Sequence, residues 1–217
     1  MAAVSIYSIY GHISPIFRRK RFQAFLDRIE PRMEDAILDV GGAPGTWTAQ
    51  PPVARNIVLL NIYDLELEEE AGKSHGLSSV IGSGCELPYR DSEFEVLFSN
   101  SVIEHVGSWE DQVQFASEAR RVGRKLWIQT PARGFFIEPH YIAPFIHWFP
   151  KSWQKRMVRW FSVRGWTEKL SQKQVDDMVE EIRLISLGEM KKLFPDCEIV
   201  KERFLGIFVK SYVAVRR

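Results

Sequence analysis

The most informative stretch of the sequence is Ala36-Ile37-Leu38-Asp39-Val40-Gly41-Gly42-Ala43-Pro44-Gly45. Its apolar first half predicts a buried strand, and the glycines that follow predict a tight turn. Glycines at the carboxyl end of a first parallel strand let a ligand approach the backbone closely. Because a carboxylate beside the turn repels a pyrophosphate but suits an ammonium or sulfonium group, Asp39 favours a positively charged ligand over a dinucleotide. The alternative is a glycine turn that only reverses the chain.

Short apolar runs alternate with helical patterns after this turn. Further buried strands are expected at Ile57–Leu60, Ser79–Ile81, Glu95–Ser99 and Lys125–Thr130. One intervening helix, residues 109–121, carries apolar residues at helical spacing, namely Trp109, Val113, Ala116 and Ala119. This alternation predicts parallel strands joined by crossover helices, which is an α/β sheet.

The end of the chain follows a different pattern. Helices are expected at Lys173–Ile185 and at Leu187–Phe194, the second ending before Pro195. The runs Glu198–Arg203 and Ile207–Val215 then leave no room for a crossover helix between them. We therefore expect these last two strands to be antiparallel.

Composition indicates one globular domain. The chain has 217 residues, of which 45% are hydrophobic and 26% charged, enough to build a sizeable core. Its 29 Lys and Arg residues nearly balance its 28 Asp and Glu residues, so a dedicated nucleic-acid binder with a basic surface is disfavoured. Two cysteines, Cys85 and Cys197, can build neither a disulfide scaffold nor a cysteine-rich zinc site. We expect a reducing, cytoplasmic compartment.

Within this single domain, residues 1–217, four segments are expected. They are an N-terminal helical arm (1–34), a core (35–131), a helical lid insertion (134–185) and a last helix with the antiparallel strand pair (186–217).

The N-terminal run Ala2–Phe17 is largely apolar. Its positive charges, Arg18–Arg21, follow the apolar run instead of preceding it, which predicts a helix or arm and not a secretory signal. No apolar run in the chain is long enough for a membrane-spanning helix.

Two stretches resemble a known family. Asp39–Gly45 resembles the first motif of the class I S-adenosylmethionine-dependent methyltransferases, usually D/E-x-G-x-G-x-G. Leu87–Val106, which contains Ser99-Asn100 and Glu104-His105, is similar to the signature of the small-molecule branch that includes ubiquinone and menaquinone methylases. The resemblance covers residues 35–131 and reaches the last two strands in topology only.

The resemblance implies a Rossmann-like fold: a seven-stranded, mostly parallel sheet with one antiparallel strand, helices on both faces and a helical lid. It also implies S-adenosyl-L-methionine as the cofactor and S-adenosyl-L-homocysteine as the product. Asp39 would lie near the methionyl end of the cofactor, Asn61 (with Asp64 nearby) would take the place of the acid that binds the ribose, and Ser83 that of the acid that binds the adenine. The expected cofactor residues are Asp39, Gly41, Gly42, Ala43, Gly45, Asn61, Ile62, Ser83, Gly84, Cys85, Ser99 and Asn100.

Three residues are candidates for the chemistry. His105 lies just past the fourth strand, beside the expected methyl group, where it could act as a base or could simply fix the loop. Glu138 and His140 follow the fifth strand and could form an acid–base pair, an acceptor clamp, a partial metal site or a salt-bridged hinge. Two ligands are too few for a metal site, so no metal is predicted.

The lid insertion is aromatic and basic. Residues 139–167 contain no acid and hold four of the seven tryptophans. One helical face gathers Phe149, Trp153, Met157, Trp160 and Phe161, with basic residues at Lys151, Lys155, Arg156, Arg159 and Arg164 around it. Core packing of a lid is the preferred interpretation. The alternative is contact of residues 149–166 with a membrane surface, at the inner face of the membrane, or with a lipid-linked or anionic acceptor.

The function predicted is methyl transfer to an oxygen or carbon atom of a small-molecule, lipid-linked or glycan-type acceptor. Two alternatives stay open. The chain could be a non-catalytic cofactor-binding subunit, since Ala43, Asn61 and Ser83 depart from the family pattern. Gly42–Trp47 also resembles the start of ribosomal-RNA ribose 2′-O-methyltransferases, but Ser99-Asn100 replaces the aspartate of their catalytic set, and no nucleic-acid partner is expected.

Overall fold

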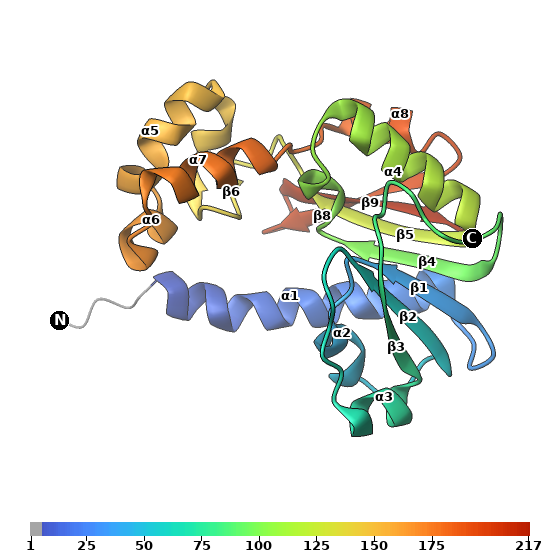
Figure 1. Cartoon of the computed structure of the whole chain (residues 1–217). Helices are drawn as coiled ribbons and strands as arrows, with labels where there is room; N and C mark the ends of the chain where they lie inside the picture. The colour runs from blue at the N-terminus through green and yellow to red at the C-terminus, as the bar shows by residue number, and fades with distance from the viewer. Residues whose placement is uncertain (1–5) are drawn as a thin grey trace.

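A computed structural model describes the backbone of residues 6–217 and the side chains of residues 18–70 and 72–217. Seven strands form one sheet in the order β3-β2-β1-β4-β5-β9-β8 (Figure 1). Their bounds are β1 Ala36–Val40, β2 Asn56–Asn61, β3 Leu77–Ile81, β4 Phe94–Asn100, β5 Gly123–Pro131, β8 Glu198–Phe204 and β9 Phe208–Arg216. Neighbouring pairs from β3 to β5 are parallel, whereas β9 is antiparallel to both β5 and β8. The Rossmann-like α/β class and the antiparallel strand near the end are confirmed.

Helices cover both faces of the sheet. On one face, α4 (Trp109–Val122) and α8 (Leu187–Leu193) pack on apolar side chains of β1, β4 and β5. On the other, α1 (Ile6–Ile29) and α2 (Pro44–Thr48) pack on the alternate side chains of the same strands. Between β2 and β3 lies α3 (Glu69–His75). Because β1 and β4 contribute buried residues to both faces, they are nearly continuous apolar runs, as expected for central parallel strands.

Helix α4 corrects one detail of the predicted pattern. Val113, expected on the buried face, is 44% exposed. The buried face carries the predicted Ala116 and Ala119 and, in addition, Phe115, Val122 and the polar Gln112. Gln112 tolerates burial because its amide donates to the carbonyls of Ile103 and Arg183.

The N-terminal segment forms the long helix α1, which runs along the sheet and extends past its edge toward the insertion (Figure 1). Residues 1–5 of the predicted arm lie outside the described residues. Phe25 is fully buried and meets Trp47, Phe98 and Trp127 edge-on, with ring centroids 5.0–6.1 Å apart. These contacts fix α1 on the sheet.

The insertion builds a small helical body. It contains the β6–β7 ladder (Ile137–Glu138 and Ala143–Pro144), the 3₁₀ turn η2 (Ile146–Trp148), and the helices α5 (Lys151–Phe161), α6 (Val163–Glu168) and α7 (Gln172–Glu181). Its own apolar cluster includes Tyr141, Ile146, Val158, Val175 and Val179. Among the described residues, no helix is long and apolar enough to cross a membrane.

The aromatic face of α5 does not pack into this cluster. Trp153 is 58% exposed, Trp160 65% and Phe161 63%, and only Met157 of the predicted stripe packs against the cluster. Gln154 and Val158 are buried instead. The preferred interpretation of the stripe as core packing is therefore wrong, because the helix turns its aromatic side chains outward.

A buried carboxylate lies beneath the first turn. Asp39 is 2% exposed, and its Oδ2 accepts a 2.8 Å hydrogen bond from the indole nitrogen of Trp47 in α2. Burial raises the Asp39 pKa to about 7, against the opposing effect of the Trp47 bond. Asp39 therefore holds α2 under the turn, and its expected place near the methionyl end of the cofactor stays a prediction.

We expect Asp39→Asn to stabilise the protein increasingly as the pH rises. The folded-state pKa lies above the unfolded value of 3.8, so the folded chain binds the proton more tightly and wild-type stability falls between about pH 4 and about pH 7. The amide keeps an acceptor for Trp47 and removes the titration. The advantage of Asp39→Asn in unfolding free energy should grow by on the order of 2 kcal/mol between about pH 5 and pH 8 in denaturant titrations.

The control is Asp64→Asn, which makes the same charge change at an exposed position. Because Asp64 is exposed, this substitution should leave the unfolding free energy close to that of the wild type. An advantage of Asp39→Asn that stays constant from pH 5 to pH 8 would show that Asp39 is not a buried charge.

Candidate active site

The predicted cofactor residues gather at one edge of the sheet. Parallel pairing of β1 with β2 and β4, and of β2 with β3, places the loops after these strands side by side at their carboxyl ends. The turn after β1 is tied to β2 by the bond from Gly41 N to the Leu60 carbonyl, 2.8 Å. A side chain at Gly41 would overlap Val102 in the loop after β4. The glycine turn and the loop that leads to His105 are therefore in direct contact.

The three glycines of this turn differ in how much space a side chain or a ligand would find beside the backbone. Gly41 has φ +74°, which favours glycine, and Gly42 is buried against the Asp39 carboxylate. A Cβ at Gly45, in the first turn of α2, would meet no atom within 4 Å. Of these three glycines, only Gly45 has open space where a side chain would lie. A ligand could therefore approach the backbone closely at Gly45.

Three of the predicted polar cofactor residues bind the protein itself. Asn61 is buried and donates to the Gly42 carbonyl at 2.9 Å. Ser99 is fully buried and donates to the Val40 carbonyl at 2.9 Å. The Asn100 amide oxygen accepts from Arg21 of α1 at 2.8 Å. These side chains shape the turn and the end of β4.

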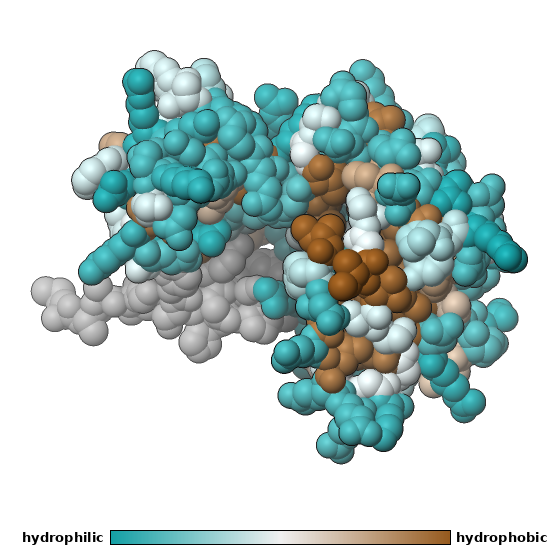
Figure 2. All heavy atoms as spheres, viewed as in Figure 1, coloured by the Kyte–Doolittle hydropathy of each residue, from teal (hydrophilic) through white to brown (hydrophobic). Residues whose placement is uncertain are grey.

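The remaining predicted cofactor residues lie in the loops after β2 and β3. Ile62 is 80% exposed, and Figure 2 shows hydrophobic side chains gathered on this visible face of the sheet domain. Ser83 accepts from the Cys85 backbone at 3.2 Å. Burial and then the Asp111 charge raise the pKa of the Cys85 thiol. A Cβ at Gly84 would lie 2.7 Å from Phe115, so this glycine serves packing on α4.

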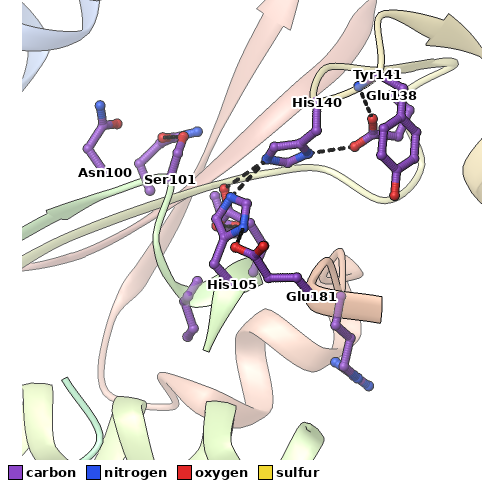
Figure 3. Close-up of polar contacts among 12 residues, drawn as sticks. Asn100, Ser101, His105, Glu138, His140, Tyr141 and Glu181 are labelled. Atoms are coloured by element: carbon purple, nitrogen blue, oxygen red, sulfur yellow. Dashed lines mark hydrogen bonds and ion pairs between the residues drawn. The ribbon is translucent and has the colours of Figure 1, made fainter. Parts of the chain in front are cut away.

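The candidate catalytic residues come together as a chain of polar contacts (Figure 3). His105 and His140 face each other with 3.1 Å between their Nε2 atoms. Glu138 is fully buried in β6; its Oε1 lies 2.6 Å from His140 Nδ1, and its Oε2 accepts from the Tyr141 backbone at 2.7 Å. The sequence predicted these three residues, and the structure brings them together across the core and the insertion.

Two further carboxylates complete this cluster. Glu181 of α7 lies 3.0 Å from His105 Nδ1. Glu104, in the 3₁₀ turn η1 (Ile103–His105), is fully buried, and its Oε2 accepts from Thr130 of β5 at 2.9 Å. Burial raises the pKa of Glu104, against the nearby His105 and His140. Burial lowers the pKa of His140, but Glu138, Glu104 and Glu181 outweigh it and the net pKa is raised.

Sequence reasoning assigned no role to Glu104 or Glu181. Glu104 stands directly before His105 in the Leu87–Val106 motif, so adjacency was a signal for it. Glu181 lies far along the chain in α7 and reaches His105 only through the fold of the insertion. A bond from Arg183 N to the Glu104 carbonyl, 2.8 Å, ties the end of the insertion to this loop.

The fold and the two sequence motifs were compared with known protein families and proteins. Residues 38–126 match the family model described as a methyltransferase domain. This match spans β1 to the middle of β5 and includes both motifs of the sequence. No curated protein matches the chain by sequence.

Solved structures share the fold. A putative sarcosine dimethylglycine methyltransferase from Galdieria sulphuraria aligns with TM-score 0.54 at 18% identity, over 88% of this chain and 61% of that one. Phosphoethanolamine N-methyltransferase 2 of Haemonchus contortus, in complex with S-adenosyl-L-methionine, aligns with TM-score 0.54 at 14% identity, over 84% of this chain and 38% of that one. A chain in a complex of the Haloferax volcanii Trm112 activator with a putative methyltransferase aligns with TM-score 0.50 at 11% identity, over 97% of this chain and 95% of that one.

This chain thus spans about three fifths of the Galdieria protein and a smaller share of the Haemonchus protein. The narrower resemblance to ubiquinone and menaquinone methylases stays a prediction. Residues 38–126 are thus similar to a methyltransferase domain, and the two motifs and the strand order are those expected of a class I S-adenosylmethionine-dependent methyltransferase fold.

Proposed function

We propose that this methyltransferase acts on a hydroxyl oxygen of a small-molecule or lipid-linked acceptor. The observation that carries the proposal is the contact, 3.1 Å long, between His140 of the insertion and His105 of the loop that contacts the glycine turn. A hydroxyl is a poor nucleophile until its proton is removed, so a cluster of imidazoles and carboxylates suits it. A neutral amine needs no such help, and a carbon acceptor would have to be activated by its own substituents.

The residues at the sheet edge fit the cofactor. Open space above Gly45 and the exposed backbone at Gly41 and Ala43 would receive the methionyl part. The exposed Ile62 offers an apolar surface for the adenine, and the loop Ser83–Cys85 lies after the neighbouring strand. When bound, the cofactor supplies a sulfonium methyl group, which is electrophilic.

The balance of the reaction defines what the chain must do. The acceptor O–H bond breaks and its proton leaves, the oxygen forms a bond to the methyl carbon, and the S–C bond breaks to give a neutral thioether. The protein must hold the oxygen in line and take charge of the proton. The cluster around His105 and His140 is placed for the second task.

The outward aromatic face of α5 supports a lipid-linked acceptor. Trp153 and Trp160 are exposed, Arg159 lies 5.7 Å from the Trp160 ring centroid, and Arg156 is exposed as well. Tryptophan beside arginine suits the boundary between apolar chains and anionic headgroups. The proposal therefore includes a cytoplasmic location for the protein and contact of residues 149–166 with the membrane surface.

Cofactor binding is tested at Gly45. We expect Gly45→Val to weaken S-adenosylhomocysteine binding more than tenfold in calorimetry, because the new side chain enters the space left for the ligand. The matched control is Gly188→Val, at the second position of α8, where a Cβ likewise meets nothing within 4 Å. Both variants should unfold near the wild-type temperature. Unchanged affinity of Gly45→Val would refute this placement of the cofactor. Gly41→Val cannot serve, since it clashes with Val102 whatever binds.

The acceptor class is tested by turnover. Purified protein is given labelled S-adenosylmethionine and matched pairs of hydroxyl and amine acceptors, including phenols and isoprenoid alcohols. We expect methyl transfer to hydroxyls, reduced more than tenfold in His105→Ala and His140→Ala with S-adenosylhomocysteine still bound, and unchanged in His75→Ala. Transfer to amines alone, unaffected by His105→Ala, would contradict hydroxyl methylation and leave the methyltransferase domain itself unquestioned.

The aromatic face is tested separately. Trp153→Ala and Trp160→Ala should weaken acceptor binding while S-adenosylhomocysteine affinity stays within about threefold, under 1 kcal/mol. Because both side chains are exposed, neither substitution should lower the unfolding temperature appreciably. Co-sedimentation with anionic vesicles at low salt checks the membrane contact. Equal sedimentation of wild type and both variants would exclude a role for these tryptophans at the membrane.

A further inference from the structure

Three side-chain atoms with lone pairs converge at the junction of the core and the insertion. They belong to Glu104, His105 and His140, and they all lie within 4.8 Å of one another. The two Nε2 atoms are 3.1 Å apart, and Glu104 Oε1 lies 3.9 Å from His140 Nε2. Figure 3 shows the two imidazole rings meeting at these atoms.

The hydrogen bonds behind the rings assign the protons. His105 Nδ1 faces Glu181 Oε1 at 3.0 Å, and His140 Nδ1 faces Glu138 Oε1 at 2.6 Å. A carboxylate only accepts, so each Nδ1 carries a hydrogen, and the two Nε2 atoms are left facing each other. Two bare lone pairs at this distance repel, so the contact requires either a hydrogen on one Nε2 or a metal ion that both nitrogens bind.

The Glu104 carboxylate is a second, independent sign that a ligand binds at this point. Its side chain is fully buried, Thr130 satisfies Oε2, and Oε1 is buried without a hydrogen-bond partner. A buried carboxylate oxygen without a partner is costly. The unsatisfied oxygen lies on the side of the carboxylate nearest His140, where the two ring nitrogens meet.

We propose that Glu104, His105 and His140 bind one divalent transition-metal ion of the zinc class. Ligand bonds of about 2.0–2.2 Å place neighbouring ligand atoms about 3–4 Å apart, close to the separations seen here. Imidazole nitrogens favour zinc and its neighbours over Mg²⁺, which prefers oxygen. Glu138 and Glu181 act as positioning residues, since a carboxylate on Nδ1 fixes the ring of a metal-bound histidine.

This site deepens the proposed function and rests on it for its role, though not for metal binding itself. Three protein ligands leave coordination positions open. An acceptor hydroxyl bound there would lose its proton more readily, since the cation stabilises the oxyanion. The metal would also bridge the core, which supplies Glu104 and His105, to the insertion, which supplies His140.

The test titrates the full chain, stripped with a chelator, with Zn²⁺ and with Mg²⁺ by calorimetry, and records the visible spectrum with Co²⁺. We expect one Zn²⁺ per chain, a raised unfolding temperature, no comparable Mg²⁺ binding, and Co²⁺ bands that report nitrogen ligands. Glu104→Gln, which preserves shape, and His140→Ala should each weaken Zn²⁺ binding more than tenfold. Glu180→Gln and His75→Ala, which alter a carboxylate and an imidazole outside the cluster, should bind as wild type.

Absence of saturable Zn²⁺ binding would overturn the proposal, as would wild-type affinity in folded Glu104→Gln and His140→Ala. Circular dichroism verifies that each variant is folded. Glu138→Gln alters a residue that positions the His140 ring, so it should weaken Zn²⁺ binding less than Glu104→Gln does. Failure here is distinguishable from failure of hydroxyl methylation. Metal-free protein that methylates hydroxyls at full rate overturns the role of the metal in the reaction and leaves the proposed function. Zn²⁺ bound through Glu104 and His140 without hydroxyl methylation supports the metal site and rejects that function.

Discussion

The parallel pairing of β1 with β4 is the constraint on which the site depends. It aligns Asp39 with Phe98, so both strands end at the same level and their loops must share the space beyond. The Gly41 turn then packs on Val102, and the buried Glu104 and the half-buried His105 follow two and three residues later in that loop. Pairing of β4 with β5 adds Thr130 beneath Glu104. Strand register therefore places the glycine turn next to Glu104 and His105.

Several polar side chains are buried near the carboxyl ends of β1, β2 and β4. Asp39, Asn61 and Ser99 are all buried, and each is bonded to a backbone carbonyl or an indole of the turn region. Their hydrogen bonds hold a glycine-rich loop that otherwise has few side chains to pack. The cofactor would consequently be recognised mostly by backbone and shape. For this reason, the departures from the family pattern at Ala43 and Ser83 leave the loops at this edge of the sheet in place.

Much of the fold could be predicted from the sequence, because central parallel strands leave long apolar runs and the glycine turn marks the end of the first. The burial of individual helix faces could not. Val113 and Phe115 of α4 are both apolar, and only the sheet beneath decides that Phe115 is the buried one. On α5, aromatic spacing indicated a packed face, yet Val158 and Gln154 fill that position. For the site, His105, Glu138 and His140 were predicted, whereas Glu104 and Glu181 required the tertiary structure.

The cluster also determines how the insertion is held to the core. Glu104 and His105 belong to the loop after β4, while Glu138, His140 and Glu181 belong to the insertion. Phe135 and Phe136 of the insertion pack on Phe204 and Phe208 of the last two strands, and polar contacts add to this join. The His105–His140 contact, the His105–Glu181 contact and the Arg183–Glu104 bond all cross this junction. The ring nitrogens of His105 and His140 therefore meet at the point where the insertion joins the core, so the geometry of this cluster depends on how the insertion docks.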